Sequence, residues 1–159
     1  MRGWFAYELY QHMKKNKDIW AIVGDLGYGM FDQIRKDFPD RFINTGAAEQ
    51  AMMGIACGLA LEGKTPFVYS ITTFLLYRPF EAIRNYVNHE QIPVKLVGSG
   101  RDKDYTHDGW SHWSEDAQNI IKNTFFKIHS FWPEYKEEIP ELVDIMIKDK
   151  SPYFISLRR

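Results

Sequence analysis

The chain has 159 residues, of which 45% are hydrophobic and 16% aromatic, as expected for one globular domain with a substantial core. Its formal net charge of -1 and its dispersed Lys and Arg residues argue against nucleic acid or an anionic membrane as a partner. The single cysteine, Cys57, excludes an internal disulfide, and no apolar run approaches the roughly 18 residues of a membrane span. Because the start also lacks a signal-peptide pattern, we expect one cytoplasmic domain over residues 1–159.

Short apolar runs alternate with amphipathic stretches along the whole chain. In chain order they predict a helix over 3–16, a strand over 19–24, a helix over 31–38, a strand over 41–44, a helix over 47–62, a strand over 66–70, a helix over 77–89, a strand over 93–97, a long polar and aromatic loop over 98–113, a helix over 115–123, a strand over 126–129, a helix over 134–148 and a strand over 153–157.

Strands that read as continuous apolar runs and alternate with helices indicate a parallel sheet covered on both faces. The sequence therefore predicts a doubly wound α/β fold, with a mainly parallel sheet of about six strands and helices on both sides. Ligands of such sheets bind at the carboxyl ends of the strands. The segments that follow these ends contain GDLGYG, TGAAEQ, SITTF and the long loop, so we expect their unusual residues to meet at one edge.

Glu49 is the most informative single residue. It opens a helix of small residues within the run PDRFINTGAAEQAMMGIACGLALEG. Apolar surroundings favour the neutral form of a carboxylic acid, so an acid placed there at a cost suggests a group that shares a proton with a ligand. The alternative is an acid at a helix N-terminus that only complements the helix dipole.

Three aromatic residues, Phe74, Tyr77 and Phe80, recur at three-residue spacing in ITTFLLYRPF. At the start of a helix they lie close to one face, where a flat heteroaromatic ring could stack. Aromatic residues at this spacing are also common in an ordinary core, and that alternative stays open.

The long loop offers a possible metal site. Its residues Asp104, His107, Asp108 and His112 are suitable zinc ligands. Their spacing matches no standard zinc pattern, so we expect no metal bound by this chain alone. Cys57 lies in GIACGLAL and is expected to be a small buried thiol.

The runs PDRF, GAAEQ, the helix of small residues, GKTPFVYSITTF and DGWSH occur in this order over nearly the whole chain. Together they resemble the pyrimidine-binding domain of thiamine diphosphate enzymes of the transketolase and deoxyxylulose-phosphate synthase group. The α/β fold read from the strands agrees with that domain. The resemblance implies a transketolase-like transferase that moves a two-carbon ketol unit between sugars or related carbonyl compounds.

The resemblance also implies roles at the cofactor. Glu49 would hydrogen-bond the pyrimidine ring of thiamine diphosphate and promote the imino tautomer that deprotonates the thiazolium ring. Phe74 would stack on the aminopyrimidine, with Tyr77 and Phe80 completing its pocket. Asp25, in GDLGYG, matches an acid that faces the neighbouring active site across a dimer.

The block HDGWSH resembles the family's D-G-P-T-H, which implies that His107, Asp108 and His112 contact the substrate, with His112 transferring protons. Trp110 and Ser111 depart from the family's Pro and Thr, which puts the acceptor pocket in question.

Two arginines are candidate anion contacts. The family's upstream His is absent, and Arg101 stands in that segment. Arg159, next to Arg158 at the end of the sequence, falls where the family has an Arg that binds substrate phosphate, although terminal arginines are ordinarily solvated.

These 159 residues lack the family's GDG motif with a distant Asn, which holds the cofactor diphosphate through Mg²⁺ or Ca²⁺. The resemblance therefore implies a separate diphosphate-binding partner chain, in an α2β2 heterotetramer. The Ala- and Gly-rich helix with Met52 and Met53 suits such an interface. A β-type subunit of a decarboxylating 2-oxoacid enzyme and a noncatalytic regulatory subunit are the alternatives.

Overall fold

A computed structural model describes all 159 residues and contains one six-stranded sheet, in which every neighbouring pair is parallel. The strand order is β2-β1-β3-β4-β6-β5. The predicted α/β fold with a parallel sheet of six strands is confirmed. The strands are β1 (Ile19–Val23), β2 (Phe42–Asn44), β3 (Thr65–Ile71), β4 (Lys95–Ser99), β5 (His129–Phe131) and β6 (Tyr153–Leu157).

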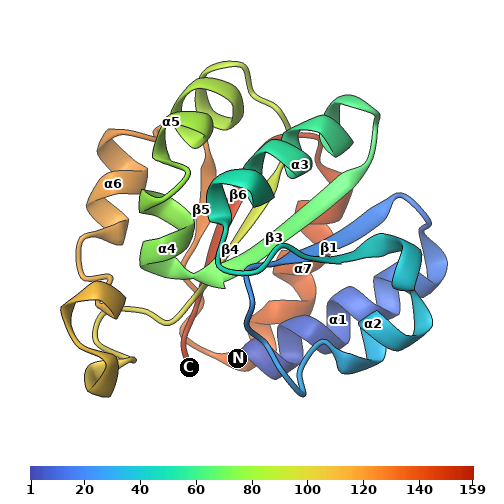
Figure 1. Cartoon of the computed structure of the whole chain (residues 1–159), viewed down its shortest axis with the longest axis horizontal. Helices are drawn as coiled ribbons and strands as arrows, with labels where there is room; N and C mark the ends of the chain where they lie inside the picture. The colour runs from blue at the N-terminus through green and yellow to red at the C-terminus, as the bar shows by residue number, and fades with distance from the viewer.

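Helices cover both faces of the sheet (Figure 1). On one face lie α1 (Arg2–Lys15), α2 (Asp32–Asp37) and α7 (Ile139–Lys148), and on the other lie α3 (Glu49–Leu61), α4 (Thr72–Tyr77), α5 (Phe80–Ala82), the π-helix η2 (Ile83–His89) and α6 (Ala117–Asn123). Short 3-10 turns complete the structure: η1 (Pro39–Arg41), η3 (Thr106–Asp108), η4 (Trp110–His112) and η5 (Lys136–Glu138).

The core is divided by the sheet into two clusters of 19 and 18 buried residues. In β1, Ile22 joins the cluster beneath α3, whereas Ala21 and Val23 join the cluster beneath α1. Successive side chains of a strand point to opposite faces, so a strand covered on both sides must be apolar throughout. This explains why the strands read as continuous apolar runs.

The helix expected over 77–89 is the largest departure from the sequence prediction. It starts at Thr72, immediately after β3, and α4 ends at Tyr77. Pro79 then separates α4 from α5, because proline has no N–H for the helical ladder and its ring clashes with the preceding turn.

Two strands are shifted along the chain. The strand expected over 93–97 is found at Lys95–Ser99, since Pro93 cannot donate to a ladder. The strand expected over 126–129 is found at His129–Phe131, where it pairs with β6, while Phe126 before it is exposed.

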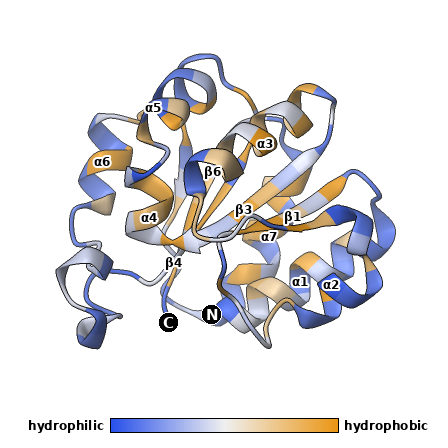
Figure 2. Cartoon of the chain, viewed as in Figure 1, coloured by the Kyte–Doolittle hydropathy of each residue, from blue (hydrophilic) through white to orange (hydrophobic).

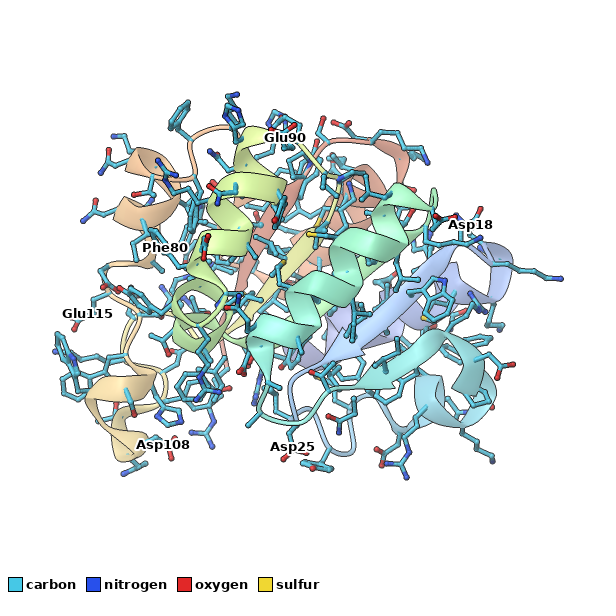
Figure 3. All side chains as sticks on the ribbon, turned by 45° about the horizontal axis from the view of Figure 1, so that its top comes forward. Asp18, Asp25, Phe80, Glu90, Asp108 and Glu115 are labelled. Carbon is cyan, nitrogen blue, oxygen red and sulfur yellow. The ribbon has the colours of Figure 1, made fainter.

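The strand order places a topological switch point between β1 and β3, because the chain passes from β1 outward to β2 and then returns to the opposite side of β1. Ligands of open α/β sheets bind at such a point, at the carboxyl ends of the strands. Figure 3 shows Asp25 and Asp108 along this edge of the molecule, with Asp18 and Glu90 along the opposite edge.

None of the helices is both long and apolar enough to span a membrane.

Candidate functional site

Glu49 lies at the switch point as the first residue of α3, and its side chain is 1% exposed. Ser70, near the end of β3, donates a hydrogen bond of 2.8 Å to Glu49 Oε1. Arg78 Nη1 donates to Oε2 at 2.6 Å. The carboxylate is therefore buried, but each of its oxygens has a partner.

The absence of a side chain at Gly24, which follows β1, makes room for this carboxylate. A Cβ at that position would lie 3.0 Å from Glu49 Oε1 and 3.2 Å from Ser70 Oγ. Since both distances are tighter than ordinary van der Waals contact, an alanine there would press on the acid. Gly24, Ser70 and Glu49 thus form one unit built from the ends of two neighbouring strands and the start of a helix.

Phe74 is joined to Glu49 through Arg78. The Arg78 guanidinium carbon lies 3.8 Å from the centre of the Phe74 ring, a stacked cation–π contact. Phe74 and Arg78 are four residues apart at the end of α4, a spacing that places two side chains on one helical face. The Phe74 ring, the guanidinium and the Glu49 carboxylate form a continuous series of contacts.

His112 meets the other end of this series. Its ring packs edge-on against Phe74, with the ring centres 4.8 Å apart. Ser111 Oγ lies 2.9 Å from His112 Nδ1, which leaves Nε2 as the nitrogen that can face a ligand. The structure thus brings Glu49, Phe74 and His112 together, from segments far apart in the sequence.

Threonine side chains at the start of α4 hold the backbone of the loop that carries His112. Thr73 Oγ1 donates to the Ser111 carbonyl at 2.8 Å, and Thr72 Oγ1 donates to the Gly100 carbonyl at 2.6 Å. Asp102 and Ser114 form an antiparallel bridge that closes the loop. The loop contains two 3-10 turns, and these turns orient His112.

His107 and Asp108 lie in the first of these turns with exposed side chains. Neither contacts Glu49 or Phe74 in this structure. Their expected substrate contacts stay predictions. No group of three or more His, Cys, Asp or Glu side chains is arranged to hold a metal ion in this structure.

Asp25 is exposed at the same sheet edge. Its φ of 53° is uncommon for a residue other than glycine, and its carboxylate accepts a hydrogen bond of 2.6 Å from Tyr28. Its backbone N–H donates to Asn44 Oδ1 at 3.1 Å, which ties the end of β1 to the end of β2. The contact with another subunit expected of Asp25 stays a prediction.

Tyr77 and Phe80 do not join Phe74 in one cluster. The Tyr77 hydroxyl donates to Asp116, and burial together with this bond raises the pKa of Tyr77 to about 12. Tyr77 lines a small pocket of about 220 Å³ that is bordered by Trp110 and Trp113. Phe80 packs against Phe125 with ring centres 5.1 Å apart, as part of the core (Figure 3).

Arg101 is 5% exposed and is held inside the domain. Its guanidinium donates to the carbonyls of Pro133 and Ser156, to Ser156 Oγ and to Glu134 at distances between 2.7 and 3.2 Å. Burial lowers the pKa of this arginine from its ordinary value. An anion contact by Arg101 stays a prediction, and it would require some of these bonds to break.

Arg159 is exposed at the chain end, where its guanidinium carbon lies 5.3 Å from the ring centre of Tyr105. Its backbone N–H donates to Asp104 at 2.9 Å. Asp104 also accepts from the Arg101 backbone N–H at 3.0 Å, so these contacts hold the chain end beside the start of the loop. The phosphate contact expected of Arg159 stays a prediction.

Three residues of the site were missed by the sequence analysis: Gly24, Ser70 and Arg78. Ser70 could have been found from its position near the end of a predicted strand at the switch point. Arg78 carried a weaker signal, its four-residue spacing from Phe74. Its pairing with an acid 29 residues earlier in the chain depends on the tertiary fold.

Comparison with known proteins gives a consistent result. The family profile described as "Transketolase, pyrimidine binding domain" matches residues 1–159. A "Putative transketolase C-terminal section" from Methanocaldococcus jannaschii is 37% identical over 113 residues, which cover 70% of this chain and 36% of that protein. One subunit of an apulose-4-phosphate transketolase from Actinobacillus succinogenes is 34% identical over 146 residues, covering 91% of this chain and 47% of that protein.

Among solved structures, one described as "Split gene transketolase, inactive beta4 tetramer" superimposes with a TM-score of 0.86 and 27% sequence identity. The match covers 99% of this chain and 50% of that one. The chain thus spans between about a third and a half of the length of the proteins it matches.

Proposed function

This chain belongs to the family of transketolase pyrimidine-binding domains, and from that premise we propose that residues 1–159 form the pyrimidine-binding half of the active site of a split, transketolase-like enzyme. The enzyme would transfer a two-carbon ketol unit between sugar or sugar-like carbonyl compounds with thiamine diphosphate. One observation supports this proposal above the others: Glu49 is buried at the switch point, and a planar nitrogen-rich group stacked on Phe74 reaches its carboxylate.

The residues present fit an aminopyrimidine ring. The contacts of Arg78 support this fit, because its flat guanidinium lies over the Phe74 ring and donates to Glu49 Oε2. We assign Phe74 to stacking and Glu49 to the hydrogen bond with the ring. When bound, the cofactor supplies the carbon nucleophile that carries the two-carbon unit.

Glu49 would hold a proton at the pyrimidine ring through Oε2, while Ser70 fixes Oε1. A carboxyl group that is fixed in one orientation and shielded from water suits general acid–base work, because competing hydrogen bonds from solvent are excluded. We propose Glu49 as the acid that activates the cofactor.

His112 would act on the substrate. Its contact with Phe74 sets it beside the proposed cofactor position, and Ser111 at Nδ1 leaves Nε2 free for a substrate hydroxyl. We propose proton transfer at Nε2, with Asp108 and His107 reaching the substrate from the same loop. Tyr77, Phe80, Asp25, Arg101 and Arg159 keep the roles given above as predictions.

A separate chain would hold the diphosphate and its Mg²⁺ or Ca²⁺. The names of two similar proteins support this proposal, since one is called a transketolase subunit and the other a split gene transketolase. The outward face of α3 also supports it, since its exposed positions carry no charge and, apart from Gln50 at the start of the helix, are small or apolar: Ala51, Gly54, Ile55, Gly58 and Leu61. Figure 2 shows how little of the middle of α3 is hydrophilic.

Two copies of each chain, with active sites between unlike subunits, form the proposed α2β2 arrangement. We further propose a cytoplasmic location and a role in carbohydrate metabolism. The single free thiol, Cys57, suits a reducing compartment, and burial raises its pKa to about 11.

The test is reconstitution with the diphosphate-binding chain, thiamine diphosphate and Mg²⁺. We expect ketol transfer from a ketose donor to an aldehyde acceptor, and none by this chain alone. Turnover by this chain alone would contradict the split assignment. Activity with a 2-oxoacid donor in place of the ketose would favour the decarboxylating alternative. A regulatory subunit would show no ketol transfer, and Glu49→Gln would leave its regulatory function unaltered.

A further inference from the structure

Arg78 has no part in the chemistry proposed above, yet it contacts both groups that an aminopyrimidine ring would need, the face of the Phe74 ring and Oε2 of Glu49. Its guanidinium lies 3.8 Å from the centre of the Phe74 ring, and its Nη1 lies 2.6 Å from Glu49 Oε2. A ring that stacked on the same face of Phe74 and bonded the same oxygen would require the volume that the guanidinium fills. The two groups therefore cannot occupy the site together.

The contacts of Arg78 also differ from those of a structural arginine. A guanidinium has five N–H donors, and Arg78 uses one of them, toward Glu49. Its side chain is 41% exposed. Arg101, by contrast, is buried and makes four donations, two of them to backbone carbonyls. Arg78 is thus free to turn its charged end into water while its stem stays on the domain.

The flat shape of the guanidinium matters as much as its charge. It stacks on an aromatic face and donates from its edge, as an aminopyrimidine does, whereas a lysine ammonium is a point charge without a flat face. The pairing keeps the Glu49 carboxylate oriented and matched in charge while no cofactor is present.

We propose that Arg78 occupies the place of the aminopyrimidine in the cofactor-free protein and swings into solvent when the ring enters, which makes it a residue that determines cofactor affinity. The inference rests on the proposed function, because it takes the aminopyrimidine as the occupant of the site. A protein whose competent state is only a fraction of the total binds with an apparent Kd raised by the inverse of that fraction. Arg78 therefore lowers affinity for the cofactor and for any ligand that cannot displace it.

The test is the Kd of thiamine diphosphate for Arg78→Met in the protein assembled with its diphosphate-binding chain and Mg²⁺. Methionine keeps the apolar stem and removes the competing group, so we expect affinity to rise about tenfold if the open state is about one tenth of the total. Arg84→Met is the matched control, since Arg84 is an exposed arginine on η2 whose side chain donates one hydrogen bond, to its neighbour Asn85. Its Kd should equal that of the wild type.

A second measurement follows Arg78 itself. The side-chain N–H resonance of Arg78, assigned through Arg78→Met, should lose the ring-current shift of Phe74 when thiamine diphosphate is added to the wild-type assembly. A purely structural ion pair would leave that resonance in place, and Arg78→Met would then bind the cofactor equally or more weakly. Either result overturns the inference.

The outcomes separate this inference from the proposed function. If neither the wild type nor Arg78→Met binds thiamine diphosphate, the proposed function fails and the inference fails with it. If the wild type binds and Arg78→Met gains no affinity, only the inference fails. Binding by Arg78→Met that is tighter than wild-type binding supports both.

Discussion

Glu49 and Lys95 are two charged residues at opposite ends of the same sheet, and each is about 1% exposed. Lys95 begins β4, where Nζ donates to the carbonyl of Asp149 at 2.8 Å and to the carbonyl of Ser151. Both partners are backbone groups. Glu49 instead relies on the hydroxyl of Ser70 and on Arg78, a half-exposed side chain.

The difference distinguishes a structural charge from the charge that we propose to be functional. The partners of Lys95 cannot leave without unfolding the turn that carries them, so no ligand can replace them. The main partner of Glu49 can move into solvent, and a ligand can then take its place. Burial alone does not point to a functional site, whereas burial with an exchangeable partner at a switch point supports the role that we propose for Glu49.

Glu49→Gln should have the largest effect, and only on activity. Glutamine keeps the shape and the acceptor for Ser70 but cannot share a proton as a carboxyl group does, so turnover of the assembled enzyme should fall by about 10²- to 10⁴-fold. The free energy of unfolding, measured in urea, should change by less than about 1 kcal/mol. Glu62→Gln, at the exposed other end of α3, is the control and should retain full turnover.

Lys95→Met should show the opposite pattern, with an effect on stability and none on cofactor affinity. Burial lowers the pKa of Lys95 to about 8, so between pH 8 and 10.5 the unfolded chain binds more protons than the folded one. Stability from this group therefore rises with pH through that window. Between pH 7.5 and 9.5 the gain should be about 2 kcal/mol.

Urea unfolding of the wild type and of Lys95→Met at these two pH values checks this prediction, because the difference between the two proteins removes the contributions of tyrosines and of Cys57. Lys148→Met is the control, as Lys148 is exposed. An identical pH dependence in Lys95→Met and the wild type would show that the two buried charges do not differ as described.

Phe74→Leu should weaken thiamine diphosphate binding by about tenfold, because an aromatic contact contributes about 0.5–1.5 kcal/mol beyond its buried area. Phe80→Leu sharpens the assignment. Phe80 packs on Phe125, so its loss should lower the free energy of unfolding by about 1 kcal/mol and leave the affinity nearly unchanged. Equal losses of thiamine diphosphate affinity in Phe74→Leu and Phe80→Leu would show that Phe80 also belongs to the cofactor site.

Ser70→Ala should have the smallest effect of this set on turnover. It removes one hydrogen bond to Glu49 Oε1, worth about 1 kcal/mol, and should slow the assembled enzyme about fivefold. Ser130→Ala, at an exposed position on β5, is the control. Unchanged turnover in Ser70→Ala would mean that Glu49 needs no support from β3.

The sequence predicted the fold well because the strands are buried on both faces and therefore read as apolar runs. Glu49 was singled out for a different reason, as an acid in a setting of small residues, and the structure places it, buried, at the start of α3. The break at Pro79 was missed, since the aromatic spacing of the segment suggested one continuous helix. That break lies directly before Phe80, which packs against Phe125 at the edge of the core.

Contacts between residues that are distant in the sequence could not be predicted from sequence periodicity. Lys95 stands in KLVGS with no local sign of burial, because its partners are carbonyls more than 50 residues away. Arg101 was expected to be an anion contact, and nothing in the sequence indicated that it is buried and makes four donations within the domain. Arg78 was overlooked because its role comes from two contacts at once, one local and one across the fold.

The most direct test is an experimental structure of the assembled protein with bound thiamine diphosphate. We predict a Glu49 carboxylate about 3 Å from a ring nitrogen of the aminopyrimidine, with that ring on Phe74 and Arg78 turned to solvent. An aminopyrimidine bound elsewhere, with Glu49 still paired to Arg78, would contradict the assignment of Glu49 as the acid that activates the cofactor.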